Sequence, residues 1–498
     1  MALEELFISL GFYIWIIIFS IIGLLYWYLN VPPNLPPGSA GLPIVGYLPY
    51  ISSPPYKGFS SLEKKFGPIF HLYLGNRLVI VLNDYVAIKE AFIKQADVFA
   101  GRIRDANFVR NDSERHGVVN DDGEYWKQHR RFVLHNLRDN GVGKLTFEPL
   151  LLNEIRHFLA ELKKHSGKPT PMKDILYCSL SNNVHLLVTG NRYDYEHPTI
   201  QRMIRALHNF SEHGQPLAFH TFFPWISKIP GSNRITKHEL RWQDMDEIIS
   251  IANGIVTDNN RDRQAQYECL VDAYIDEMKS NEGNLKSIFS KNGLLHVCRD
   301  LMTAGAETSS RTMLWGMIYL TNHPEVQKKA QKEIDAVIGR DREPSYNDRS
   351  QTPYTVAMIT EIHRIVSLVP MALPHRNMKE IKVLGYTIPK DTMIIANLWH
   401  ANNDPKLWGD PENFRPERFI GSDGRLVIPE YFVPFSIGKR ACAGEPLARM
   451  ELYLYFTSLL QHFDIISLDG AKLPLDGSEK VTRSPIFDVI CVRERSTE

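Results

Sequence analysis

Cysteine is scarce in this chain, and no two cysteines lie close together in the sequence. Among 498 residues there are only Cys178, Cys269, Cys298, Cys442 and Cys491, with no CxxC pair. An odd number of widely spaced cysteines excludes a disulfide framework and is typical of a reducing compartment. The same spacing argues against a structural zinc site, which needs several Cys or His ligands close together.

An excess of charge of one sign is also lacking. Lys+Arg and Asp+Glu number 57 each, so the formal net charge is 0. No overall field attracts nucleic acid or an acidic polymer, and we expect no nucleic-acid partner. No G-x-G-x-x-G segment follows a predicted strand, so the chain has no dinucleotide fingerprint of its own. A content of 44% hydrophobic and 23% charged residues is nevertheless that of a large globular protein.

One long apolar run stands near the amino terminus. Residues 6–29, LFISLGFYIWIIIFSIIGLLYWYL, carry no charge, and such a run exceeds the roughly 20 residues that cross a bilayer. It is too long for the h-region of a cleaved signal peptide, and no small-residue cleavage site follows. The run predicts a transmembrane helix within an N-terminal signal anchor, residues 1–30. The short acidic segment before it is easily translocated, which would leave the rest of the chain in the cytosol.

A proline-rich hinge, residues 31–44, follows the anchor, because its prolines cannot continue a helix. No internal repeat or low-complexity linker interrupts residues 45–498, which we predict to be one domain, mainly α with a small β region. An apolar alternation over Ile69–Leu74, a Gly75-Asn76 turn and Leu78–Leu82 predict a β-hairpin. Further predicted elements are helices over Gly293–Asn322, Pro324–Gly339 and Leu447–Leu460, and a small sheet over Ile381–Asn397.

The segment Phe435–Gly444, FSIGKRACAG, carries the strongest chemical signal. Cys442 lies just before a predicted helix and close to Lys439 and Arg440. The helix dipole and the neighbouring cations favour the thiolate, which could bind a soft metal or act as a nucleophile. Taken alone, however, a single cysteine is more often a small buried hydrophobic residue.

The pattern as a whole resembles the haem-binding signature FxxGxRxCxG of the cytochrome P450 superfamily at every fixed position. Each shorter motif is weak alone, but five in the right order behind an anchor and a hinge are specific. The chain is similar to the animal microsomal enzymes that oxidise drugs, steroids and fatty acids. The other four motifs are Trp126–Arg130 (WxxxR), Ala304–Thr308 (AGx[D/E]T), Glu361–Arg364 (ExxR) and Pro416–Phe419 (PERF).

The resemblance implies a cytochrome P450 fold that holds haem b. Cys442 would be the proximal thiolate ligand of the iron, where its electron donation favours O–O cleavage. The two haem propionates need cations or donors when they are buried. Taken singly, each cationic residue in this role could instead be an ordinary exposed charge, and His375 could be an ordinary hydrogen-bonded histidine. The residues that the resemblance places around the haem are Arg102, Trp126, Arg130, Ala304, His375, Phe435 and Arg440.

On the opposite side of the haem, the resemblance makes Thr308 and Glu307 the catalytic pair that delivers protons for oxygen activation. Thr308 can bond to its own helix backbone and hold water, although without Cys442 it would equally be a helix-surface residue. Gly305 would allow close approach of a flat ligand. The resemblance also implies a buried, structural salt-bridge triad of Glu361, Arg364 and Arg418.

Most substrate contacts that the resemblance implies are apolar, which predicts a lipophilic substrate. The segment 219–229, FHTFFPWISKI, is apolar enough to dip into a membrane, with ordinary core as an equal alternative. The predicted contacts are Phe108, Phe210, His213, Asp300, Ala304, Val369, Leu373 and Ile486.

Electrons would have to come from outside, because the chain has no flavin or nicotinamide site. The resemblance implies NADPH–cytochrome P450 reductase, which carries the flavins, and cytochrome b5 as a further candidate. Such an acidic partner could meet cations on the proximal face, although each of them singly is more readily a solvated surface charge. These cations are Lys127, Arg131, Arg138 and Lys439.

These features together predict a haem-thiolate monooxygenase in the endoplasmic reticulum membrane, which hydroxylates, epoxidises or dealkylates a lipophilic small molecule. A xenobiotic, such as a drug or pesticide, is the expected substrate. A dedicated hydroxylase of a steroid, fatty acid or terpenoid is the alternative, because selectivity depends on the shape of the pocket. Thr308 and Glu307 argue against a reductase-independent isomerase or dehydratase of peroxides. The complete set of motifs argues against a non-catalytic haem or lipid binder.

Overall fold

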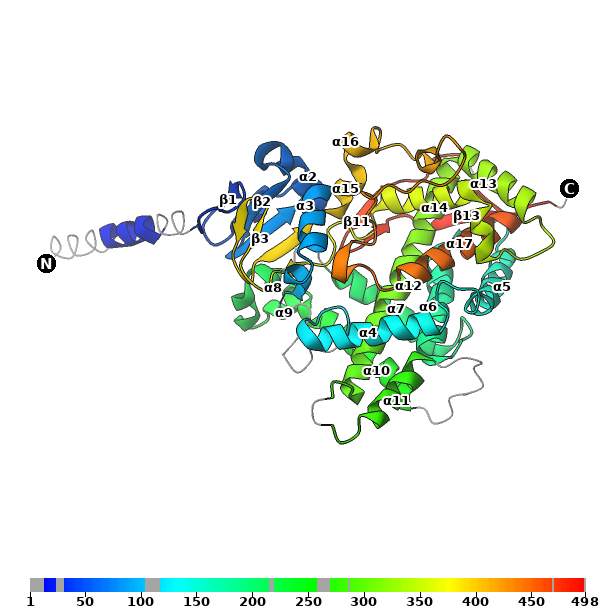
Figure 1. Cartoon of the computed structure of the whole chain (residues 1–498), viewed down its shortest axis with the longest axis horizontal. Helices are drawn as coiled ribbons and strands as arrows, with labels where there is room; N and C mark the ends of the chain where they lie inside the picture. Colours follow the sequence, from blue (N-terminus) through cyan, green and yellow to red (C-terminus); the bar gives the residue numbers. More distant parts are fainter. Residues whose placement is uncertain are drawn as a thin grey trace.

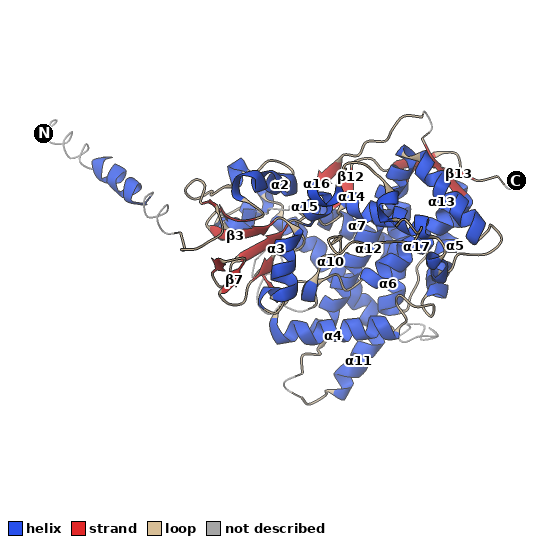
Figure 2. Ribbon diagram, turned by 45° about the horizontal axis from the view of Figure 1, so that its top comes forward, coloured by secondary structure: helices blue, strands red, loops and turns tan. Residues whose placement is uncertain are grey.

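The computed structural model describes residues 13–23, 31–103, 117–214, 219–257, 269–284, 287–467 and 470–496. Helices surround one long central helix, α12 (Lys291–Asn322), as Figure 1 shows. The larger sheet lies at one end of this helical body, on the side of the amino terminus (Figure 2). The prediction of a mainly α protein with a small β region is therefore confirmed.

Proline begins several of the helices, since its fixed φ suits the first turn and its missing N–H needs no partner there. Besides α12, the labelled α-helices are α2 (Pro55–Phe66), α3 (Tyr85–Lys89), α4 (Gly123–Asp139), α5 (Glu148–Lys164), α6 (Met172–Thr189), α7 (Pro198–His213), α8 (Phe219–Phe222), α9 (Ser232–Ile235), α10 (His238–Thr257), α11 (Leu270–Ser280), α13 (Pro324–Val337), α14 (Pro353–Val366), α15 (Leu398–Asn403), α16 (Pro405–Trp408) and α17 (Glu445–His462).

The six strands of the larger sheet lie in the order β1-β2-β3-β9-β6-β4. These strands are β1 (Gly38–Ser39), β2 (Ile69–Leu74), β3 (Arg77–Leu82), β4 (Gly101–Arg102), β6 (His375–Arg376) and β9 (Met393–Ala396). The smaller sheets pair β7 (Ile381–Val383) with β8 (Tyr386–Ile388), β11 (Gly477–Glu479) with β12 (Arg483–Pro485), and β13 (Val489–Glu494) with β10 (Phe463–Ile466) and β5 (Pro169–Pro171).

The predicted hairpin is present as β2 and β3, which pair antiparallel from Ile69 with Leu82 to Leu74 with Arg77. The prediction of one small sheet over residues 381–397 needs correction. β7 and β8 form a separate hairpin, whereas β9 joins the larger sheet and runs parallel to β3. Local strand propensity cannot predict this pairing, because the parallel neighbour of β9 comes from a distant part of the chain.

Helix α12 forms the centre of the core. Ser290 caps its start by accepting a hydrogen bond from the backbone N–H of Gly293 at 3.0 Å, so the helix begins slightly earlier than predicted. It ends at Asn322, and Pro324 opens α13 as expected. Because α6, α10, α14 and α17 all pack against it, α12 is buried on nearly every side, including Trp315 near its end.

Residues 13–23 form a helix whose apolar side chains are exposed, including Trp15 and Phe19, and which lies apart from the body in Figure 1. Within the described residues, no helix has both the length and the apolar character needed to cross a membrane. The remainder of the predicted span, residues 6–12 and 24–29, lies outside the described part of the chain.

Candidate active site

A tight loop places Cys442 just before the first turn of α17. The backbone N–H of Cys442 donates to the carbonyl oxygen of Phe435 at 3.0 Å, which closes this loop. Gly438 has a φ of 81°, and a Cβ there would lie 1.9 Å from the carbonyl oxygen of Phe92. Only glycine fits such a position, so the glycine of the haem signature lets the loop approach the neighbouring backbone.

Cys442 is chemically distinct from the other cysteines. All five cysteines lie in the described residues, and Cys442 alone is exposed. Burial among protein atoms still raises the pKa of its thiol, and this rise is opposed by the backbone N–H groups of Gly444 and Glu445 and by the charge of Arg130. By contrast, burial raises the pKa of Cys178 to about 12 with no cation to oppose it. Accessible, and surrounded by donors to a thiolate, Cys442 is suited to bind a metal ion.

Three buried or half-buried arginines lie together near Cys442. Arg102 donates to the carbonyl of Leu373 at 2.8 Å, Arg440 to that of Ala100 at 2.8 Å, and Arg130 to that of Ala441 at 2.5 Å. Burial and then mutual repulsion lower the pKa of Arg440 to about 8. The same two causes lower the pKa of Arg102 to about 10. Because these arginines repel one another and are buried, their charged forms are destabilised. A bound group that carries carboxylates would supply the missing counter-charge.

Trp126 and His375 complete this cluster. The guanidinium of Arg440 lies 3.6 Å from the ring centre of Trp126. The indole Nε1 of Trp126 is buried and has no hydrogen-bond partner among the described residues, so this donor is available for an acceptor on a bound group. His375 bonds through Nδ1 to the carbonyl of Phe99 at 2.7 Å, and its pKa lies well below the usual value because of burial and nearby Arg102. An accessible cysteine, several cations and an indole donor without a described partner together fit a haem.

One face of α12 borders space that protein atoms do not fill. Ala304 is exposed and Thr308 is half-exposed, although most of this helix is buried. The two residues are four positions apart and therefore share a face, and the Thr308 hydroxyl donates to the Ala304 carbonyl at 2.8 Å. Ser309 donates to Glu451 of α17 at 2.9 Å, which ties this part of α12 to the helix that follows Cys442.

Gly305 has a different role from the predicted one. A Cβ at Gly305 would lie 2.7 Å from a methyl carbon of Val184 on α6, so the missing side chain permits α12 to pack on α6. One residue turns the helix by about 100°, and this rotation carries position 305 away from the face of Ala304 and Thr308. The prediction that Gly305 admits a flat ligand therefore needs correction.

Glu307 does not point freely into solvent. Its buried carboxylate pairs with Arg311 at 3.1 Å and accepts a hydrogen bond from Thr482 at 2.8 Å. Arg311 and Glu451 carried no prediction from the sequence motifs. Both are charged residues inside apolar helical runs, and Arg311 follows Glu307 by four positions, which is the spacing of an intrahelical ion pair. The spacing of four positions could therefore have predicted the ion pair of Arg311 with Glu307.

The three members of the predicted triad are brought together by the structure. The Arg364 guanidinium pairs with Glu361 at 2.6 Å, and the Arg418 guanidinium reaches the same carboxylate at 3.0 Å. Glu361 and Arg364 are both fully buried. Arg364 also donates to the carbonyls of Asn402 and Pro411, so the triad ties α14 to the last turn of α15 and to the loop after α16.

Two of the predicted substrate contacts are engaged within the protein. Asp300 accepts hydrogen bonds from the backbone N–H groups of Val118 and Val119 at 2.8 and 3.0 Å, and it also pairs with Arg299. His213 bonds to Asp244 of α10 at 2.7 Å. Asp300 thus holds the segment that leads into α4, and His213 ties α7 to α10.

The remaining predicted contacts are apolar. Val369 and Leu373 are partly exposed, and Ile486 is 70% exposed. The ring of Phe210 lies 4.8 Å from the guanidinium of Arg241. Phe108 belongs to residues 104–116, outside the described part of the chain. Phe435 begins the loop that carries Cys442. Its ring packs against His363, with 4.9 Å between ring centres.

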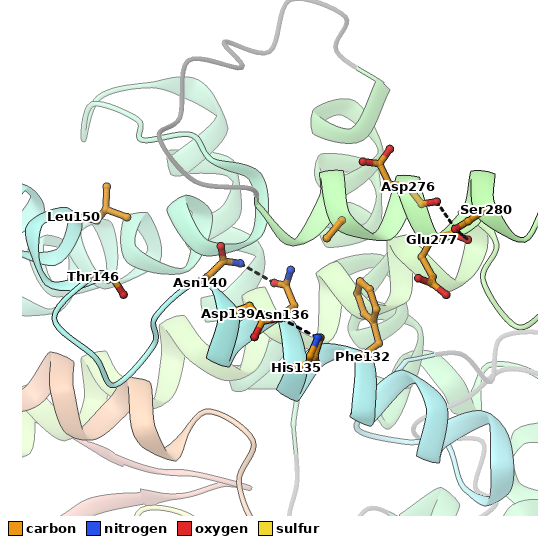
Figure 3. A pocket seen from close by; sticks show the side chains of 11 residues that line it. Phe132, His135, Asn136, Asp139, Asn140, Thr146, Leu150, Asp276, Glu277 and Ser280 are labelled. Atoms are coloured by element: carbon orange, nitrogen blue, oxygen red, sulfur yellow. Dashed lines mark hydrogen bonds and ion pairs between the residues drawn. The ribbon is translucent and has the colours of Figure 1, made fainter.

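A separate groove of about 710 Å³ lies between α4, α5 and α11 (Figure 3). It contains none of the predicted site residues. His135 and Asp139 form an ion pair at its edge, with 2.9 Å between Nε2 and the carboxylate. Its lining is mainly polar and its acidic members outnumber its one histidine, which distinguishes it from a haem site. The lining residues are Phe132, His135, Asn136, Asp139, Asn140, Thr146, Leu150, Ala273, Asp276, Glu277 and Ser280.

Glu451 predicts a specific pH dependence of stability. Burial raises its pKa to about 7 from 4.5, against the opposing hydrogen bonds of Ser309 and Asn183. Between these pH values the folded state binds more protons than the unfolded state, so stability falls as pH rises through this window and is constant above it. For the wild type, this titration should lower the free energy of unfolding by about 3 kcal/mol as pH rises between the two values. We expect Glu451→Gln to lack this decrease.

Denaturant unfolding of both proteins at pH of about 4.5 and 8 measures this effect. The exposed Glu282→Gln makes the same chemical change at the surface and serves as the control. Equal pH dependence in the wild type and Glu451→Gln would show that Glu451 titrates normally.

A helical body with an accessible cysteine in a tight loop, a cation cluster and an open face on a central helix is the arrangement expected of a haem-thiolate protein. The family model of cytochrome P450 matches residues 36–491. This chain belongs to the cytochrome P450 family and is a P450 monooxygenase. As such it uses haem held by a cysteine thiolate, and the electrons of NADPH reach it through a redox partner.

Individual relatives match over most of their length. Cytochrome P450 2U1 of Homo sapiens is 34% identical over 475 residues, which covers 89% of this chain and 86% of the relative. Cytochrome P450 2C11 of Rattus norvegicus is 36% identical over 455 residues, covering 88% of each chain. Cytochrome P450 2H1 of Gallus gallus is 37% identical over 443 residues, again covering 88% of each.

Proposed function

We propose that this P450 inserts one oxygen atom of O2 into a lipophilic xenobiotic, such as a drug or pesticide. One observation carries the lipophilic class. The two polar side chains among the predicted substrate contacts, Asp300 and His213, are engaged by Arg299 and Asp244. The partly exposed Val369, Leu373 and Ile486 therefore leave apolar surface for the substrate.

The bound haem supplies the oxidising chemistry, and the chain supplies its ligand, its counter-charges and a route for protons. Cys442 is the proposed axial ligand, while Arg102, Arg130, Arg440, Trp126 and His375 form the proposed propionate site. Thr308 Oγ1 is the proposed proton-carrying atom on the open face of α12, because its hydroxyl already bridges to the backbone and is accessible to water. Glu307 stands next to it as the acidic member of the pair.

We propose NADPH–cytochrome P450 reductase as the electron donor, with cytochrome b5 as a second donor, and Arg131 as the leading contact. Lys127 lies 3.7 Å from Glu124, Lys439 pairs with Asp97, and Arg138 is engaged by Asp139 and His135. Arg131 is exposed and forms no ion pair with a described residue. A cation without an internal counter-charge contributes most to an acidic partner.

The proposed location is the endoplasmic reticulum membrane, with residues 6–29 as the anchor and the catalytic domain in the cytosol. The segment 219–229 supports a second membrane contact. Phe222 and Phe223 are buried, whereas Trp225 and Ile229 are 50% and 48% exposed. Residues 220–223 are therefore part of the core, whereas Trp225 and Ile229 present an aromatic and an aliphatic side chain that suit a lipid surface.

The carbon monoxide difference spectrum of the reduced, full-length protein in membranes tests the haem assignment. A red-shifted Soret band is expected for thiolate ligation. Turnover of a panel of drugs, pesticides, steroids, fatty acids and terpenoids with the reductase then tests the substrate class. A single endogenous compound oxidised far faster than every xenobiotic would replace the xenobiotic proposal with a dedicated hydroxylase.

Thr308→Ala is expected to uncouple electron use from product formation. Loss of the hydroxyl removes the proposed proton carrier, and product per NADPH should fall by about tenfold or more while hydrogen peroxide rises. Thr321→Ala is the matched control, because Thr321 lies on the same helix and makes the same type of bond to the carbonyl of Met317. Unchanged coupling in Thr308→Ala would exclude Thr308 from the proton route.

A further inference from the structure

A single buried arginine joins four elements beside the proposed oxygen-activation segment. Arg311 lies one turn after Glu307 on α12 and is 2% exposed. Its Nε donates to the Tyr177 hydroxyl of α6 at 3.1 Å, and its other nitrogens donate to Ser211 of α7 and to Thr482. Thr482 lies in the turn between β11 and β12.

This arginine also determines the surroundings of Glu307. Arg311 pairs with the Glu307 carboxylate at 3.1 Å, and Thr482 donates to the same carboxylate oxygen. A buried guanidinium is stable only when its donors are satisfied and its charge is paired, so these contacts depend on one another. Movement of Ser211 or Thr482 therefore changes the contacts that hold Glu307.

The two outer partners belong to the proposed substrate side. Ser211 lies in the last turn of α7, between the predicted contacts Phe210 and His213, and Thr482 lies four residues before Ile486. A second contact, between Glu212 and Lys480, ties the same turn of α7 to the same hairpin. The end of α7 and the β11–β12 turn are thus bound to each other at their outer side and to Arg311 at their inner side.

We propose that Arg311 is a positioning residue that couples α7 and the β11–β12 hairpin to Glu307. This rests on the proposed function, because it assigns the pair Glu307 and Thr308 to proton delivery. A substrate that displaces the end of α7 or the hairpin loosens the bonds of Arg311 to Ser211 and Thr482. Glu307 then changes its contacts next to Thr308, so that occupancy of the substrate side and preparation of the proton route become one linked equilibrium.

Hydrogen exchange of the haem-loaded, full-length protein without substrate tests the structural part. In Arg311→Gln, exchange should accelerate by roughly 10- to 100-fold at the end of α7 and at residues 477–485 together, because each loses a bond to a charged donor. Exchange in α13 should not change. Arg495→Gln removes a half-buried arginine paired with Asp335 and is the matched control that leaves both segments unchanged. Unchanged exchange at either segment in Arg311→Gln would overturn the coupling.

Ser211→Ala tests the functional part and avoids removal of a buried charge. Within the described part of the chain, Ser211 is linked to Glu307 through Arg311. The variant should therefore lower product per NADPH several-fold, and its effect should not add to that of Glu307→Gln. Arg311→Lys, which keeps the charge but not the fork of donors, should give partial recovery relative to Arg311→Gln. Additive effects, or a change in KM alone, would refute the link to Glu307. The hydrogen-exchange experiment uses no substrate, so its result does not depend on the substrate class. A failure of the proposed function can therefore be distinguished from a failure of the coupling through Arg311.

Discussion

Cys442→Ala is expected to abolish both the red-shifted carbon monoxide band and all monooxygenase turnover. The substitution removes the only exposed cysteine of the five, where backbone N–H groups and Arg130 oppose the rise in thiol pKa that burial causes. Without the thiolate, the haem would lose both its anchor and the electron donation that favours O–O cleavage. The carbon monoxide difference spectrum and product formation with reductase measure the two losses separately.

Cys491→Ala is the matched control for this substitution. Cys491 is a buried cysteine of β13, 3% exposed, and its removal makes the same chemical change away from the cation cluster. It should retain the red-shifted band and most of the turnover. Product formation by Cys442→Ala at the wild-type rate would contradict the assignment of Cys442 as the axial ligand and therefore the proposed mechanism.

Glu361→Gln is expected to destabilise the fold and prevent haem incorporation, without a change of substrate preference in any protein that folds. Glu361 faces Arg364 and Arg418 at 2.6 and 3.0 Å, and both it and Arg364 are fully buried. The neutral amide leaves the buried Arg364 without a counter-charge, whereas Arg418 keeps Asp410 at 3.3 Å. Breaking a buried pair in this way costs about 3–5 kcal/mol. Haem content per chain and the midpoint of denaturant unfolding measure this effect.

The exposed pair of Arg425 and Asp423 provides the comparison. Its side chains are 87% and 60% exposed and lie 3.7 Å apart. Asp423→Asn removes one carboxylate charge as Glu361→Gln does, but solvent screens an exposed pair, so the expected change is below about 1 kcal/mol. Similar midpoints for the two variants would contradict a structural role of the buried triad.

Several local patterns were sufficient to predict local structure. The alternation of residues 69–82 predicted the hairpin, and the glycine, proline and apolar spacing around residues 291–339 predicted two consecutive helices. These predictions succeeded because hairpins and amphipathic or buried helices depend on neighbouring residues. The pairing of β9 with β3 joins positions more than 300 residues apart, so no local pattern could predict it.

The site shows the same division. The haem signature, the ExxR motif and the central-helix motif predicted site roles for Cys442, Glu361, Arg364 and Thr308, because each motif combines residue type with fixed spacing. Of these predictions, the structure confirms that Glu361 and Arg364 pair. The partners of Glu307, Asp300 and His213 were beyond such patterns. They depend on which side chains of other elements lie opposite them, and the structure supplied Arg311, the backbone of Val118 and Val119, and Asp244.

The amino-acid sequence by itself determined the class of this protein, its haem cofactor and three of its helices, because these follow from short-range spacing and residue chemistry. Tertiary structure alone decided that Gly305 serves packing, that Asp300 holds the segment before α4, and that Arg311 joins Glu307 to α6, α7 and the turn between β11 and β12. Each of these outcomes depends on burial, which makes an unpaired charge costly and forces distant residues to satisfy one another.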